Sequence, residues 1–167
     1  MTTLIAFLIA TFLAATGFFF YAQQPSVSPV DSESEHETQM IPALTSRDRS
    51  GQNLTTMPTD ILAMNNLQQL DLSNNMLTGA LPAEIRHLQN LQILDISNNK
   101  MTGLPAELGQ LSKLRVLDAS NNQLTGIPHE LGNLQNLEVL DLSGNDISEQ
   151  DLHIIRDKLP KTTRITL

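Results

Sequence analysis

From Leu67 onward, leucines and polar residues alternate in a pattern that occurs four times. The first copy reads LQQLDLSNNMLTG, and later copies begin at Leu91, Leu114 and Leu137, at steps of 24, 23 and 23 residues. Within each copy the second and third leucine positions lie two residues apart, as a strand with one buried face requires. The pattern therefore predicts one short strand per copy, with Leu70 and its counterparts pointing into a core.

A second apolar pattern follows each strand and predicts a short helix. Leu81, Ile85 and Leu88 are spaced by four and three residues, so they lie on one helical face. A proline precedes this stretch, and we expect it at the first helical position because its missing N–H is not needed there. A glutamate follows two residues later, next to the positive end of the helix dipole, so we interpret it as structural. These positions are Pro82, Pro105 and Pro128, with Glu84, Glu107 and Glu130.

The period of about 23 residues, with L-x-x-L-x-L-x-x-N-x-L in every copy, resembles the leucine-rich repeat family. The resemblance covers residues 44–167, nearly three quarters of the chain. It implies an α/β fold in which a right-handed solenoid, or horseshoe, carries a parallel β-sheet on its concave face. Short helices or 3-10 turns form the convex face. Coils start at residues 67, 91, 114 and 137, between caps at 44–66 and 148–167.

Both caps depart from the repeat in ways that suit a terminal coil. Arg47 and Arg49 occupy the inward positions of the first coil, where charge protects an exposed strand edge. At the other end, Ser148 resembles a helix N-cap before a longer amphipathic helix that Pro160 ends. The last residues, with Ile165 and Leu167 inward, predict a final half-strand.

One polar column recurs at the turn that leaves each strand. A buried amide needs partners for its donors and its acceptor, and the backbone of neighbouring coils can provide them. We therefore interpret these residues as a structural asparagine ladder. The asparagine ladder comprises Asn75, Asn99, Asn122 and Asn145.

The residues between the inward leucines are expected on the concave, solvent-facing side of the sheet. Because parallel strands stack about 4.8 Å apart, they form three continuous rows across the coils. Repeat proteins of this kind present such a surface to a partner. The apolar row is Gln69, Ile93, Val116 and Val139; the aspartate row is Asp71, Asp95, Asp118 and Asp141; the serine row is Ser73, Ser97, Ser120 and Ser143.

The N-terminal 22 residues are expected to form a transmembrane anchor. Leu4 to Ala22 carries no charge, and as a helix it would span roughly 28 Å, close to the hydrocarbon thickness of a bilayer. A cleavable signal peptide is the alternative, but residues 1–3 lack the usual Lys or Arg. Residues 23–43 are rich in Ser, Pro and Glu and predict a disordered linker. The first Lys or Arg after the uncharged stretch is Arg47, so no basic residue near its end holds that end in the cytoplasm, and we expect the repeat domain outside the cytoplasm.

The amino-acid composition excludes several classes of function. The net charge of −8 argues against nucleic-acid binding, and the lack of cysteine excludes disulfides, thiolate metal sites and cysteine nucleophiles. No catalytic motif, phosphate loop or clustered histidines occur, so we expect no enzyme, cofactor or metal. The L-T-G spelling resembles the plant-type subclass, but the cysteine-paired caps of eukaryotic extracellular members are missing, which favours a bacterial envelope protein.

These observations predict a monomeric, membrane-tethered protein-interaction module that presents its concave face to a protein partner. The alternative is a secreted or structural cell-envelope protein, with weak cation binding by the aspartate row. Calcium prefers six to eight converging oxygen ligands, and a linear row of carboxylates offers fewer.

Overall fold

The structure, a computed structural model, describes residues 45–167. The predicted anchor (residues 1–22) and linker (residues 23–43) lie outside the described residues. Between residues 45 and 167, no helix is long and apolar enough to cross a membrane.

Six short parallel strands form one sheet, and they follow one another in chain order except that β3 and β5 are left out. Residues at equivalent repeat positions pair, as in Leu70 with Leu94 and Leu94 with Leu117. The predicted repeat register is therefore confirmed. The strands are β1 (Ser46–Asp48), β2 (Gln69–Asp71), β4 (Ile93–Asp95), β6 (Val116–Asp118), β7 (Val139–Asp141) and β8 (Arg164–Thr166). A second, two-stranded sheet pairs β3 (Thr78–Gly79) with β5 (Lys100–Met101).

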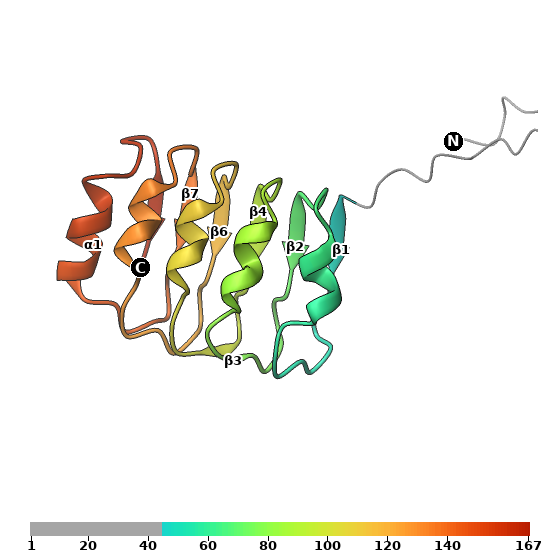
Figure 1. Ribbon diagram of the computed structural model, residues 1–167. Coiled ribbons are helices and arrows are strands. Elements are labelled where there is room, and N and C mark those ends of the chain that lie inside the picture. The colour runs from blue at the N-terminus through green and yellow to red at the C-terminus, as the bar shows by residue number, and fades with distance from the viewer. Residues whose placement is uncertain (1–44) are drawn as a thin grey trace, which may run out of the picture. The chain divides into compact units, whose positions relative to one another are not determined.

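Each middle coil returns through a 3-10 helix of five residues, so strands and helices form two layers (Figure 1). The prolines precede these helices with extended ψ angles, one residue earlier than predicted. The reason is that the Pro82 carbonyl accepts the first helical bond, from Ile85 N–H at 3.0 Å, and proline needs no N–H to do so. The helices are η1 (Thr59–Ala63), η2 (Ala83–His87), η3 (Ala106–Gln110) and η4 (His129–Asn133).

The core lies between the sheet and the helices and is almost entirely aliphatic. In the middle coils, the central residue of each strand and the apolar helix face are fully buried, as for Leu94, Leu108 and Leu117 at 0% exposure. The four full coils contribute apolar side chains from equivalent positions, so each coil buries its apolar surface against its neighbours.

The asparagine ladder links successive coils, as predicted. The Asn99 side chain accepts a hydrogen bond from Leu77 N–H at 3.0 Å and donates to the Leu72 carbonyl at 3.0 Å, both in the preceding coil. It also donates to Ile96 O and Ser97 O in its own coil. Asn75, Asn99 and Asn122 are buried, whereas Asn145 in the last coil is half-buried.

A second asparagine precedes each of the first three ladder residues and has a separate backbone role. Asn74, Asn98 and Asn121 have φ angles between 51° and 55°, in the left-handed region that asparagine tolerates better than most residues. Gly144 takes this position in the last coil, with a φ of 70°. A Cβ on Gly144 would lie 2.5 Å from Oδ1 of Asn121, so any side chain here would force the Asn121 amide to turn away.

The N-terminal cap places two arginines at inward positions. Arg47 pairs with Leu70 in the sheet register, and Nη2 atoms of Arg47 and Arg49 lie 3.5 and 3.2 Å from one Asp60 carboxylate oxygen. This arrangement confirms the expected charged end coil and ties η1 to β1.

The C-terminal cap contains the only α-helix among residues 45–167, α1 (Glu149–Arg156). Ser148 Oγ accepts from Asp151 N–H at 3.1 Å, which confirms the predicted N-cap. Ile165 is half-buried beside Leu140, but Leu167, expected to point inward, is 54% exposed because β8 ends at Thr166.

Helices η3 and η4 approach each other so closely that η3 needs a glycine. A Cβ on Gly109 would lie 2.2 Å from the Glu130 carbonyl oxygen, a backbone atom. Gly103, in contrast, has open space around the Cβ position and no positive φ.

Gly109→Ala should lower the free energy of unfolding by about 1–3 kcal/mol, because the backbone of η4 must shift. Gly103→Ala is the matched control and should be neutral or stabilising by roughly 0.4–1 kcal/mol through loss of chain entropy in the unfolded state. Urea denaturation of the two variants measures both. Equal stability of the two variants would contradict the close packing of η3 and η4.

Asn122→Ala should lower the free energy of unfolding by about 1–3 kcal/mol, because Met101 N–H and the Ile96 carbonyl lose a buried partner. Asn133→Ala is the control, since Asn133 is exposed at the end of η4. Thermal and urea melts that show the same loss for both variants would rule out a structural role specific to the ladder.

Candidate interaction face

In the six-stranded sheet, the first and third residues of each strand point away from the core. We call the surface that they form the open face. In β2 and β4 the first residue is exposed, the second is buried and the third is half-buried. The alternation follows from the strand period of two. The sheet register aligns Gln69, Ile93, Val116 and Val139 as one row and the four aspartates as a second row.

The apolar row keeps part of its surface in solvent. Ile93 is 36% exposed, one of three large hydrophobic residues exposed to this degree among residues 45–167. Val116 and Val139 are half-buried, and Gln69 is exposed. These side chains sit on a rigid sheet, so a partner can cover them with little ordering of the protein.

The aspartate row is held in one orientation by the turn that follows each strand. Asp95 Oδ1 accepts hydrogen bonds from Ser97 N–H at 2.9 Å and from Ser97 Oγ–H at 2.7 Å. Asp118 and Asp141 bind Ser120 and Ser143 in the same way. Asp71 accepts only from Ser73 N–H, and the Ser73 hydroxyl oxygen accepts from Asn74 Nδ2.

The predicted serine row is wrong as a contact surface. Ser73, Ser97 and Ser120 are only 5%, 5% and 8% exposed, and Ser143 is half-buried. The hydroxyls of Ser97, Ser120 and Ser143 turn toward the aspartate two residues earlier, so they orient the carboxylates instead of facing a partner.

Asp48, which was not predicted from the sequence, continues the aspartate row by one coil. Asp48 pairs with Asp71 in the register, and its Oδ1 accepts from Ser50 N–H at 2.9 Å and Ser50 Oγ–H at 2.7 Å. These two donors, the N–H first, lower the pKa of Asp48 below its ordinary value. The signal was present, because D-x-S occurs at residues 48–50 just as at residues 71–73.

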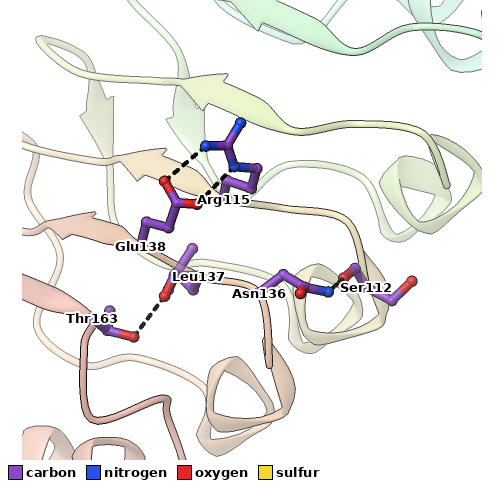
Figure 2. A network of polar contacts seen from close by, with 6 residues as sticks. All are labelled: Ser112, Arg115, Asn136, Leu137, Glu138 and Thr163. Atoms are coloured by element: carbon purple, nitrogen blue, oxygen red, sulfur yellow. Dashed lines mark hydrogen bonds and ion pairs between the residues drawn. The ribbon is translucent and has the colours of Figure 1, made fainter.

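A charged pair at the rim of the open face was also missed. Arg115 Nε and Nη2 donate to Glu138 Oε1 and Oε2 at 2.9 and 3.0 Å, a two-bond pair between adjacent coils (Figure 2). The hydrogen bond from Arg115 lowers the pKa of Glu138, and the same bond raises the pKa of Arg115. These residues directly precede Val116 and Val139, so they border the apolar row.

Side-chain bonds to backbone hold the coils beside this pair. Asn136 Nδ2 donates to the Ser112 carbonyl at 2.7 Å, and Thr163 Oγ1 donates to the Leu137 carbonyl at 2.6 Å (Figure 2). Each bond crosses from one coil to the next. These bonds hold neighbouring coils at a fixed distance beside the Arg115–Glu138 pair.

No three His, Asp or Glu side chains converge on a point suited to a metal ion anywhere in residues 45–167. The aspartates instead follow one another along the row, one per strand. A hollow of about 390 Å³ lies elsewhere, at the C-terminal cap, where Arg156, Lys161 and Ile165 line it. The open face is thus the surface whose residues repeat in register over several coils.

Comparison with protein families identifies the repeat. The profile described as "Leucine-rich repeat region" matches residues 51–164. The chain belongs to the leucine-rich repeat family. Proteins of this family are typically non-catalytic interaction modules, and the fold described above agrees with such a role.

Solved leucine-rich repeat structures from bacteria and plants resemble the chain. A Leptospira interrogans leucine-rich repeat protein is 43% identical, with a TM-score of 0.63 over 68% of this chain and 28% of that one. The ectodomain of the Arabidopsis thaliana receptor kinase SOBIR1 is 32% identical, with a TM-score of 0.57 over 71% and 65%. The chain thus spans less than two thirds of either protein.

A third similar structure is that of a plant receptor in a complex. The plant peptide hormone receptor RGFR1, solved in complex with RGF2, is 41% identical, with a TM-score of 0.56 over 60% of this chain and 17% of that one. A comparison with curated proteins gave no match.

Proposed function

We propose that the chain is a non-catalytic protein-interaction module whose open face binds a protein partner. The observation that carries this proposal is the apolar row, with Ile93 36% exposed on a sheet face that no other element of residues 45–167 covers. Partly exposed aliphatic side chains bordered by charged residues are the arrangement found at the centre and rim of protein interfaces.

The open face is also prepared for binding by its rigidity. Serine donors fix the carboxylates of Asp95, Asp118 and Asp141, and the ion pair fixes Arg115 and Glu138. Binding therefore orders few additional side chains, which lowers the entropic cost of association. The similarity to RGFR1, a peptide hormone receptor solved in complex with RGF2, supports a peptide or protein as the partner.

The proposal includes a membrane tether. The uncharged stretch Leu4 to Ala22 matches a bilayer in length, and the acidic residues 23–43 would give the repeat domain reach. We place the monomeric repeat domain outside the cytoplasm, in a bacterial envelope. The similarity to a Leptospira leucine-rich repeat protein supports the bacterial source. Cleavage of the N-terminal stretch, and hence secretion, is the alternative.

Replacing Ile93, Val116 and Val139 with lysine should abolish partner binding and leave stability nearly unchanged, since partly exposed sites rarely contribute more than about 0.5 kcal/mol each. A photo-crosslinking residue in place of Gln69 would capture the partner in cells. The measurement is the yield of crosslinked partner, compared between the wild-type chain and the lysine variant.

The control introduces three lysines on the helix side, at the exposed residues Ala106, Gln110 and His129. This variant should retain the crosslinked partner, and both variants should melt near the wild-type temperature. Equal crosslinking yields from the two variants would place the binding surface outside the open face.

The full chain should sediment with membranes, whereas a chain that starts at residue 23 should remain in the supernatant, because residues 4–22 alone have the length and polarity to span a bilayer. Immunoblots of carbonate-washed fractions measure the distribution. Mass spectrometry of the full chain provides the control. A mature N-terminus near Phe18 or Gln23 would replace the anchor with secretion.

A further inference from the structure

We propose, on the basis of the proposed function, that the open face binds an extended segment with a cationic side chain at every third residue. The segment runs across the strands from β1 to β7. Its cations lie opposite the aspartates, and its intervening apolar residues lie against the apolar row.

The two rows are close enough for one segment to contact both. They come from the first and third residues of the same strands, so they are separated by about 6.6 Å on one face. Ile93 and Asp95 show the relation within β4, where both side chains lie on the side opposite buried Leu94. A single extended chain above the gap reaches both rows.

The charge of the open face selects a cationic partner. Five carboxylates, from Asp48 to Asp141, follow one another in register along the face. Arg115 borders the apolar row, but its two hydrogen bonds to Glu138 pair its positive charge with a carboxylate. The first residue of β8 is Arg164, beside Val139, and it would repel a cation. The charges therefore confine the segment to β1 through β7.

The carboxylates are oriented before any partner binds. Oδ1 of Asp48, Asp95, Asp118 and Asp141 accepts two hydrogen bonds from serine, and no hydrogen bond within residues 45–167 engages their Oδ2 atoms. The Oδ2 atoms are therefore the oxygens left for an ammonium or guanidinium group, and a charge-assisted hydrogen bond there is stronger than a neutral one.

The repeat spacing decides the spacing of the cations. Neighbouring strands lie about 4.8 Å apart, so alternate aspartates are separated by about 9.6 Å. Three residues of polyproline II conformation advance about 9.3 Å, which nearly matches this separation. Two residues of β-strand advance only about 6.8 Å, which matches neither one strand nor two. Cations at every third residue thus meet Asp48, Asp95 and Asp141 in turn.

Two labelled nonapeptides of identical composition test the spacing. The first repeats Lys-Val-Pro three times, and the second places its three lysines together at one end. Fluorescence anisotropy with the full chain in neutral detergent measures their affinities at low and moderate salt. We expect the spaced peptide to bind at least about tenfold more tightly, because only its cations reach three aspartates while its valines reach the apolar row.

The variant Asp48→Asn/Asp95→Asn/Asp141→Asn should remove the difference between the two peptides. Asparagine keeps an oxygen that can accept from the serine N–H, so the turns and the thermal melt should be preserved. The matched control, Glu84→Gln/Glu107→Gln/Glu130→Gln, makes the same change in net charge on the helices and should keep the preference.

Equal affinity for the two peptides, or a preference that survives in the aspartate variant, would overturn the proposed spacing. The crosslinking experiment separates this outcome from failure of the proposed function. If the crosslinked partner still depends on Ile93, Val116 and Val139 while the peptides fail, the open face binds a partner of different chemistry. If the crosslink is independent of these residues, the proposed function itself fails.

Discussion

The hydrogen bonds of the asparagine ladder are the interaction on which the rest of the structure depends. Each ladder side chain in the middle coils accepts from the backbone of the preceding coil and donates both to that coil and to its own, as Asn99 does with Leu77, Leu72 and Ile96. Buried amides without partners are costly, so neighbouring coils must stack in the one register that satisfies them. The aliphatic core supplies most of the driving force, but it is not directional.

The surface rows are a consequence of that register. Because each strand aligns residue by residue with the next, a side chain at the first or third strand position stands beside its counterpart one coil away. As a result, the apolar side chains and the carboxylates form continuous rows across β2, β4, β6 and β7. A partner that lies along the stack meets the same chemistry at a fixed spacing, which is why we infer a fixed spacing in the partner.

The polar residues of the turns are structural, and few of them are available to a partner. In each middle coil the serine binds the aspartate, the first asparagine takes the left-handed conformation and the second forms the ladder, as Ser97, Asn98 and Asn99 show. These residues are occupied with the protein's own backbone and carboxylates. Only two positions per strand, together with the rim residues such as Arg115 and Glu138, remain for recognition.

The sequence by itself determined the repeat, its register, the inward leucines of the four full coils, the asparagine ladder, the charged first coil and the Ser148 N-cap, because each depends on local spacing and on burial that the coils repeat. Tertiary structure decided what spacing could not. Ser73, Ser97 and Ser120 are buried, and the hydroxyls of Ser97 and Ser120 turn to the aspartate two residues earlier, which is a choice of rotamer. Asp48 joins the row only when β1 pairs with β2. Arg115 meets Glu138 because stacking places residues 23 positions apart side by side, and Gly109 is required because η4 packs against that point of η3.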